Sequence, residues 1–350
     1  MKAAIYYGQR DVRIEEREMP RAGDNDIVIQ NLYASICGTD TAVYLHGPNT
    51  GHRITVGSEF GHEMVSRVVQ VGKLVKGLHV GDIVYPYPRL AKGDPKRAGT
   101  VGGFSEYVLV PNAEPEKQVY AVPRQIPLKT ACLIEPFTVG FRAARRSCPQ
   151  KGENAIVFGA GTIGIAAAIG LTCFGCGRVM VCDPSDFRLE KARALGFAVC
   201  NNSREDPKAK AMECFGRAPS RFGPTADAGI YVDAAGAESI LELYQSMGRI
   251  GSRMVVVAVR AGKRPVDVLE MTYSQHALIG SGGYFPEDVR DVLAVMAGGA
   301  WDIGSIITDE YPLSRLPQAL ERASRTDRAL NVVIRHEAAD SAFFTAPRSL

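Results

Sequence analysis

The 350-residue sequence has no apolar run that approaches the roughly 20 residues needed to span a bilayer. Residues 1–16 also lack the apolar core of a secretory signal. The formal net charge is only +3, which gives no general field for attracting nucleic acid or an anionic membrane. We therefore expect a cytoplasmic protein that binds neither nucleic acid nor membrane.

The cysteines lack the pattern of a disulfide framework. Their spacing is irregular, and they stand at positions 37, 132, 148, 173, 176, 182, 200 and 214. Together with the missing signal, this pattern favours a reducing compartment. Most of these cysteines are expected to pack as small buried hydrophobic residues, including the C-x-x-C pair Cys173 and Cys176. Cys37 is the candidate exception.

The predicted secondary structure changes near the middle of the chain. Residues 1–136 read as short strands broken by Gly, Pro, Asn or Asp, which is typical of a barrel-like β domain. From about residue 152, apolar strands alternate with helical segments as far as residue 283, which predicts a parallel, doubly wound sheet. The expected fold class is therefore α/β plus β. In residues 336–350 the apolar residues follow neither a strand period nor a helix period.

A glycine-rich turn marks a dinucleotide site in the second half. Gly159, Gly161 and Gly164 form a G-x-G-x-x-G pattern that follows an apolar strand and opens a helix at Thr162 and Ile163. The glycines allow a tight turn, close approach of a pyrophosphate and close packing of helix on strand. The helix N-terminus favours the negative phosphates. The alternative is a similar turn in a domain that binds another ligand.

An acidic residue completes this pattern. Asp183 ends the next strand, 19 residues beyond Gly164, where a carboxylate would bind the ribose hydroxyls of NAD and repel the 2′-phosphate of NADP. We therefore expect NAD as the cofactor. Arg188 lies five residues further on, either stacking on the adenine or favouring the 2′-phosphate.

Three segments of the first half carry residues that bind zinc. Cys37 follows a predicted strand, and His62 directly precedes Glu63. Glu135 lies at the end of the β-rich segment, just before the alternating strands and helices. A catalytic zinc has about three protein ligands drawn from Cys, His and Asp or Glu, with one position open. Each residue alone is more often structural, so the prediction depends on the set. Asp40 or Glu63 could orient His62 by a hydrogen bond.

With these motifs in place, the sequence resembles the zinc-dependent medium-chain dehydrogenase/reductase family, in its sorbitol, threonine and butanediol dehydrogenase branch. The resemblance covers residues 1–335. The matching stretches are CGTD at 37–40, GHEMVSRVVQVG at 61–72, GDIV at 81–84, GGFSEYVLVP at 102–111, EPFTVGFRA at 135–143, GAGTIG at 159–164, VDAAG at 232–236 and GSGGY at 280–284.

The resemblance implies two domains and a residue set. It implies a GroES-like catalytic domain at 1–136, completed by 285–350, and a Rossmann cofactor domain at 137–284. Cys37 and His62 would bind zinc together with either Glu63 or Glu135, and both acids are candidate catalytic residues. Thr39 would touch the substrate oxygen. Relatives form dimers or tetramers, so a homo-oligomer is expected.

Two departures from the family pattern limit what is carried over. Many relatives hold a structural zinc on four cysteines within the segment that corresponds to 85–107, but that segment contains no cysteine here. We therefore expect one catalytic zinc per chain and no structural zinc. Relatives often carry a His of the proton relay where this sequence has Ala42, so the outer end of the relay is not identified.

These parts predict hydride transfer between NAD and a secondary alcohol of a polyol, sugar alcohol, cyclitol or vicinal diol. The zinc would lower the pKa of the alcohol, and Thr39 would take its proton. The alternatives are a zinc-free quinone or enone reductase of the same superfamily and a non-catalytic dinucleotide-binding protein.

A phosphate or carboxylate on the substrate is a further possibility. The basic residues that suggest it are Arg89, Lys92, Lys96, Arg97, Arg142, Arg145 and Arg146. A solvated loop and helix face explain them more simply.

Overall fold

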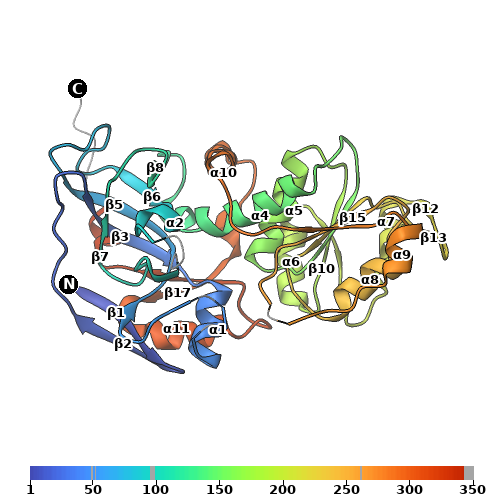
Figure 1. Cartoon of the computed structure of the whole chain (residues 1–350), viewed down its shortest axis with the longest axis horizontal. Helices are drawn as coiled ribbons and strands as arrows, with labels where there is room; N and C mark the ends of the chain where they lie inside the picture. Colours follow the sequence, from blue (N-terminus) through green and yellow to red (C-terminus); the bar gives the residue numbers. More distant parts are fainter. Residues whose placement is uncertain (49, 52, 95–98, 261, 343–350) are drawn as a thin grey trace. The chain divides into compact units, whose positions relative to one another are not determined.

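The computed structural model describes residues 1–48, 50–51, 53–94, 99–260 and 262–342 (Figure 1). The chain divides into two compact units. Unit 1 comprises Met1–Glu135, Leu293–Arg325 and Asn331–Leu350, and unit 2 comprises Pro136–Val292 and Thr326–Leu330. Among the described residues, no helix is long and apolar enough to cross a membrane.

Unit 1 is built on a seven-stranded sheet with the order β17-β18-β3-β5-β6-β8, in which β7 also pairs with β3. Its strands are β3 (Ile27–Ser35), β5 (Glu63–Val71), β6 (Ile83–Pro86), β7 (Tyr107–Val110), β8 (Val119–Ala121), β17 (Ile307–Pro312) and β18 (Asn331–Arg335). Strand β3 pairs antiparallel with β5, β7 and β18. It therefore links the early strands to the last strand, and it is buried along nearly its whole length.

Shorter elements complete unit 1. A three-stranded sheet consists of β1 (Lys2–Gly8), β2 (Asp11–Glu16) and β4 (Ser58–Glu59). The helical segments are α1 (Gly38–His46), α2 (Pro88–Ala91), α3 (Leu128–Ala131), η2 (Ile303–Ile306), η3 (Leu313–Arg315), α11 (Leu316–Ala323) and α12 (Ala338–Ala342). Helix α1 begins directly after β3, and the loop between them carries Cys37.

Unit 2 contains a six-stranded parallel sheet with the order β11-β10-β9-β14-β15-β16. The strands are β9 (Ala155–Phe158), β10 (Val179–Cys182), β11 (Ala198–Cys200), β14 (Ile230–Asp233), β15 (Arg253–Val256) and β16 (Ala277–Gly280). The strand order reverses between β9 and β14. In such sheets ligands bind at the carboxyl ends of the strands beside this reversal, where the glycine-rich turn lies.

The helices that accompany this sheet are α4 (Ile134–Arg146), α5 (Thr162–Cys173), α6 (Asp186–Ala194), α7 (Pro207–Phe215), α8 (Ser239–Met247), α9 (Val268–Tyr273) and α10 (Pro286–Gly298). Strands β9, β10 and β14 are buried throughout, as the apolar runs of parallel strands require. A hairpin of β12 (Arg217–Ser220) and β13 (Gly223–Ala226) adds a separate two-stranded sheet.

The predicted fold class is confirmed, since a β-rich unit accompanies a doubly wound parallel sheet. The sequence pattern did not indicate the β12–β13 hairpin or helix α1. The last residues that the pattern left undecided include α12, and residues 343–350 lie outside the described part of the chain.

Candidate functional site

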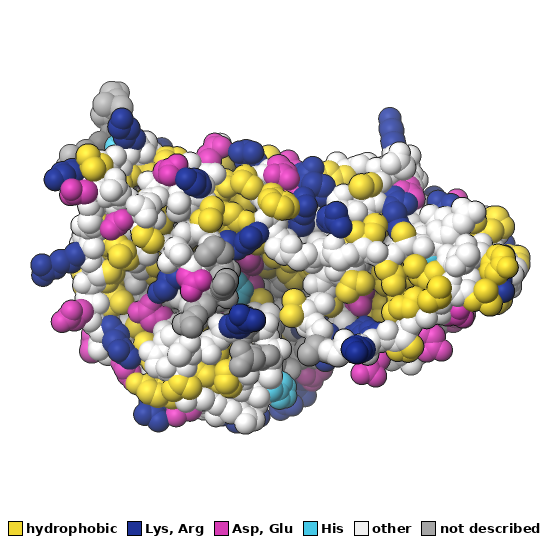
Figure 2. Space-filling view, in the orientation of Figure 1, with side chains coloured by type: hydrophobic (Ala, Val, Ile, Leu, Met, Phe, Trp, Pro, Cys, Tyr) yellow, Lys and Arg dark blue, Asp and Glu magenta, His cyan; other side chains and the backbone are white. Residues whose placement is uncertain are grey.

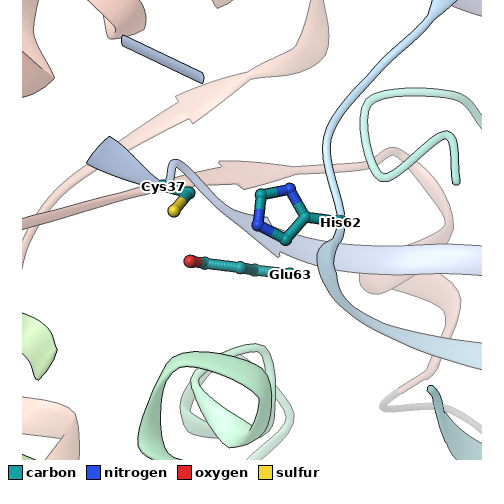
Figure 3. A group of neighbouring side chains, drawn as sticks. All are labelled: Cys37, His62 and Glu63. Atoms are coloured by element: carbon teal, nitrogen blue, oxygen red, sulfur yellow. The ribbon is translucent and has the colours of Figure 1, made fainter. Parts of the chain in front are cut away.

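Three predicted zinc ligands come together in unit 1. One ligand atom each from Cys37, His62 and Glu63 lies within 4.8 Å of the others. Figure 3 shows the side chains of Cys37 and of the adjacent His62 and Glu63 converging from two stretches of backbone. Cys37 and His62 are partly exposed, whereas Glu63 is buried. The cluster therefore offers sulfur, nitrogen and oxygen donors on a site that solvent can reach.

Strand pairing explains why residues so far apart in sequence meet. Cys37 lies just beyond the end of β3, and Glu63 is the first residue of β5. The two strands are antiparallel, and Ser35 pairs with Glu63 in their register. The loop after β3 is thereby held beside the start of β5.

Asp40 holds two members of the cluster in place. Its carboxylate is fully buried and accepts the backbone N–H of Cys37 at 3.1 Å. Its other oxygen lies 3.6 Å from Nδ1 of His62. Figure 3 shows the second ring nitrogen of His62 turned toward Cys37 and Glu63. This is the arrangement in which a carboxylate fixes the tautomer and orientation of a metal-binding histidine.

Thr39 lies beside the cluster in the first turn of α1. Its hydroxyl Oγ1 donates to the Cys37 sulfur at 3.1 Å. Because the hydroxyl proton is used in this bond, the oxygen lone pairs are left to accept a hydrogen bond from another group.

Glu135 is placed near the cluster but outside the group of three. It is buried in the first turn of α4, and its negative charge acts on Glu63. Among the described residues, the carboxylate within 4.8 Å of both the sulfur and the imidazole is that of Glu63.

The electrostatics of the cluster fit a divalent cation. Loss of hydration and the charge of Glu63 raise the pKa of the Cys37 thiol to about 11. Loss of hydration and the charge of Glu135 raise the pKa of Glu63 to about 7. Both shifts arise because burial and a neighbouring carboxylate disfavour the anionic forms, and His62 offsets them only in part. A zinc ion bound by thiolate, imidazole and carboxylate would supply further positive charge and keep a fourth position open.

The predicted dinucleotide turn lies between β9 and α5 in unit 2. Gly159 has a φ of +104°, a left-handed conformation that glycine adopts without strain. A Cβ atom on Gly164 would lie 1.8 Å from the carbonyl oxygen of Gly159, so a larger residue there would break the turn. Helix α5 begins at Thr162 and continues with Ile163, with Gly161 as its N-cap.

Asp183 is tied directly to this turn. It follows β10, and its carboxylate accepts the N–H of Ala160 and the N–H of Ser185, both at 2.8 Å. Arg188, in α6, donates from Nε and Nη2 to the carbonyl oxygen of Ala329 at 3.2 and 3.1 Å. Its Nη1 lies 3.8 Å from the position that a Cβ on Gly161 would take. The structure thus brings Asp183 and Arg188 to the glycine-rich turn.

Three of the basic residues considered for a substrate phosphate, all on α4, have other partners. Arg145 pairs with Asp288 at 2.8 Å and with Asp291, and Arg142 lies 3.7 Å from Asp288. Arg146 donates to the carbonyl oxygen of Gly280. Since acids neutralise Arg142 and Arg145, the structure favours a role in packing α4 against α10. Lys96 and Arg97 lie outside the described residues.

Sequence reasoning missed two buried polar residues near Glu63. The Ser35 hydroxyl hydrogen-bonds the Glu63 carboxylate, and Asn331 donates from Nδ2 to the Ser35 oxygen at 2.8 Å. No short motif contains this pair, because the two residues are 296 positions apart. Only the pairing of β18 with β3 brings them together.

Comparison with known proteins gives matches over both units. Residues 162–298 match the family model described as zinc-binding dehydrogenase, and residues 23–124 match the alcohol dehydrogenase GroES-like domain. These matches confirm the GroES-like and Rossmann assignments that the resemblance implied.

Individual relatives match along almost their whole length. Sorbitol dehydrogenase of Bacillus subtilis is 26% identical, with 92% of this chain and 93% of the relative covered. L-galactonate-5-dehydrogenase of Escherichia coli is 29% identical, with 94% and 97% covered. The crystal structure of 2R,3R-butanediol dehydrogenase from Bacillus subtilis aligns with a TM-score of 0.82 at 26% identity, with 95% and 99% covered. The chain is thus similar to zinc-binding dehydrogenases over residues 162–298 and to the alcohol dehydrogenase GroES-like domain over residues 23–124.

Proposed function

We propose that this chain is an NAD-dependent oxidoreductase that binds one catalytic zinc and oxidises a secondary alcohol to a ketone, or catalyses the reverse reaction. The observation that carries the proposal is the convergence of Cys37, His62 and Glu63 within 4.8 Å, with the Thr39 hydroxyl beside them. A structural protein of this fold has no need of three metal-binding side chains on a partly exposed site.

Cys37, His62 and Glu63 would hold the zinc, with Glu135 as the alternative carboxylate. When bound, zinc would supply Lewis acidity toward the alcohol oxygen, and NAD would accept the hydride. Asp40 keeps the His62 ring oriented and fixes the backbone of Cys37. The protein's contribution is thus to place the donor atoms before any ligand arrives.

Thr39 is the proposed first member of the proton relay. Its hydroxyl lies at the Cys37 sulfur, where Oγ1 would accept a hydrogen bond from the alcohol hydroxyl. As the alcohol proton arrives, Thr39 would release its own proton to the next member of the relay, which the sequence does not identify. Proton transfer by a positioned side chain typically contributes on the order of 10²–10⁴ to the rate.

The cofactor residues in this proposal are Gly159, Gly161, Thr162, Ile163, Gly164, Asp183 and Arg188. The left-handed turn at Gly159 and the start of α5 at Thr162 form the geometry that receives a pyrophosphate. Asp183 would accept the ribose hydroxyls with the lone pairs that its two backbone partners leave over. Its negative charge favours NAD over NADP.

The substrate class follows from the relatives' names together with the site. Sorbitol, butanediol and L-galactonate all carry vicinal hydroxyl groups, and the relatives are named for acting on them. We therefore propose a polyol, sugar alcohol, cyclitol or vicinal diol. The pairing of Arg142 and Arg145 with acids gives no support to a phosphate at those residues.

A substrate panel tests the proposal. Zinc-reconstituted protein with NAD is mixed with neutral polyols, phosphorylated polyols and diols, and NADH formation is followed by absorbance. We expect turnover of at least one neutral polyol or diol, loss of turnover on chelation and recovery with zinc. Failure with every alcohol, or reduction of a quinone or alkene by the metal-free chain, would contradict it.

We further propose a homodimer or homotetramer in the cytoplasm. Strand β16 is an edge strand, and apolar side chains near it are exposed, among them Val268, Leu269, Tyr273 and Leu278. Figure 2 shows hydrophobic side chains gathered over the region of α8 and α9. An unpaired edge with apolar neighbours suits pairing with a second copy. The free state of all the cysteines is consistent with a reducing compartment.

A further inference from the structure

A line of buried polar groups runs from the last strand of unit 1 to the zinc cluster. Asn331 begins β18, Ser35 ends β3 and Glu63 begins β5, and these strands are neighbours in one sheet. Their exposed fractions are 3%, 0% and 2%, so none of the three meets bulk solvent to a useful extent. Buried polar groups in such a line depend on one another for hydrogen bonds.

The direction of the hydrogen bonds is fixed by the donor at one end. Asn331 donates from Nδ2 to the Ser35 oxygen at 2.8 Å. Ser35 has one proton, and the Glu63 carboxylate can only accept it. The amide of Asn331 therefore sets the serine hydroxyl to donate toward Glu63.

Glu63 is a side chain that needs such a donor. It is buried next to the negative charge of Glu135, and both conditions disfavour its carboxylate form. A hydroxyl donor stabilises that form and restricts the side chain to the rotamer that faces Cys37 and His62. The register of β3 and β5 places Ser35 directly opposite Glu63, so the donor is carried by rigid backbone.

We propose that Asn331 and Ser35 are positioning residues that orient the Glu63 carboxylate as a metal ligand. This inference rests on the proposed function, because it takes Cys37, His62 and Glu63 to be the zinc site. It gives the C-terminal strand β18 a part in metal binding, and it predicts that Asn331 acts through Ser35 and has no contact with the metal.

The same two strands provide a matched control. Ser66 lies on β5, is fully buried, and donates from its hydroxyl to Oδ1 of Asn31 on β3 at 2.7 Å. The two residues are paired in register, as Ser35 and Glu63 are. Ser66→Ala therefore removes a buried serine hydrogen bond from the same strand pair while leaving Glu63 untouched.

The test measures metal affinity of the full chain directly. Zinc dissociation constants are determined by chelator competition, and the visible spectrum of the cobalt-substituted protein reports ligand geometry. We expect Ser35→Ala and Asn331→Leu to weaken zinc binding on the order of tenfold to a hundredfold, as loss of groups behind metal ligands does. Their cobalt spectra should change, and NAD affinity should stay as in the wild type.

The double variant separates an indirect effect from an independent one. If Asn331 acts through Ser35, the Ser35→Ala, Asn331→Leu double variant binds zinc no more weakly than Ser35→Ala alone. Ser66→Ala should keep the affinity and cobalt spectrum of the wild type even where its thermal stability falls. If one single variant does not fold, the other is compared with Ser66→Ala in the same way.

The outcomes distinguish this inference from the proposed function. A wild-type chain that binds no zinc overturns the zinc site, and with it the basis of the inference. A wild-type chain that binds zinc, with Ser35→Ala and Asn331→Leu binding it equally well, overturns the inference alone. Equal losses of affinity in Ser66→Ala and Ser35→Ala would mean that the hydrogen bonds only hold the sheet together, which also overturns it.

Discussion

The Asp183 carboxylate accepts the backbone N–H of Ala160 at 2.8 Å, so the acid after β10 is bonded to the middle of the glycine-rich turn after β9. One side chain therefore does two things in unit 2. It fixes the turn that would receive the pyrophosphate, and it carries the charge that we propose distinguishes NAD from NADP.

Replacement of Asp183 by Ala should reduce the preference for NAD over NADP. Loss of hydrogen bonds to a charged group costs about 1.5–3 kcal/mol, which lowers kcat/KM with NAD roughly tenfold to a hundredfold. NADP should lose far less or gain, because the repulsion of its 2′-phosphate is removed. Asp183→Asn is the matched control, since it keeps an acceptor for Ala160 and removes the charge. A wild type that prefers NADP would show that Arg188 outweighs Asp183.

Replacement of Thr39 by Val should impair the reaction without releasing the metal. The variant removes the hydroxyl that bonds Cys37 and is proposed to accept the alcohol proton. We expect kcat to fall on the order of 10²–10⁴, with zinc content and NAD affinity retained. Thr39→Ser keeps the hydroxyl and should retain most activity. Equal activity of the Val and Ser variants would exclude Thr39 from proton transfer.

Acidification should destabilise unit 1 through His336. Burial lowers the pKa of this residue to about 4, although its Nε2 donates to the Gly103 carbonyl at 3.1 Å. Above the ordinary pKa of about 6.5, the imidazole is neutral in both folded and unfolded chains. As the pH falls from 6.5 toward 4, His336 becomes protonated in the unfolded chain but stays neutral in the folded chain. The free energy of unfolding therefore decreases.

The loss should be about 2 kcal/mol between pH 7 and pH 5. His336→Gln lacks the titrating group, so its free energy of unfolding should depend less on pH by that amount. Urea unfolding of metal-free wild type and variant at both pH values measures the difference. Parallel pH dependence in the two proteins would contradict the assignment.

Replacement of Leu278 by Asp should disrupt the homo-oligomer. Leu278 lies on the edge strand β16 and is 36% exposed, so a carboxylate there is tolerated in the single chain but opposes pairing of two copies. Light scattering after gel filtration should show smaller particles than for the wild type. Val80→Asp, at an exposed site of unit 1, is the control and should leave the size unchanged. A wild type that is already monomeric would refute the oligomer.

The parts of the site that short motifs carry could be predicted from the sequence. Cys37, Thr39 and Asp40 lie within four residues, and His62 adjoins Glu63, so local geometry keeps each group together. Gly159 and Gly164 were also predictable, because a tight turn and a close helix contact impose glycine whatever the rest of the fold.

Contacts made only by the folded sheet could not be predicted in this way. Asn331 meets Ser35 across 296 residues because β18 pairs with β3. In the sequence Arg145 resembles an anion-binding residue, but in the structure it pairs with Asp288, 143 residues further on. The sequence pattern could not choose between Glu63 and Glu135 either, since the distances to Cys37 and His62 depend on where β5 and α4 begin.

The most direct test of the zinc site is the metal content of chelator-washed, zinc-reconstituted protein. We predict a ratio close to one zinc per chain, which falls toward zero in Cys37→Ser and His62→Ala while NAD binding is retained in unit 2. A ratio near two, or an unchanged ratio in both variants, would contradict a single zinc held by Cys37, His62 and Glu63.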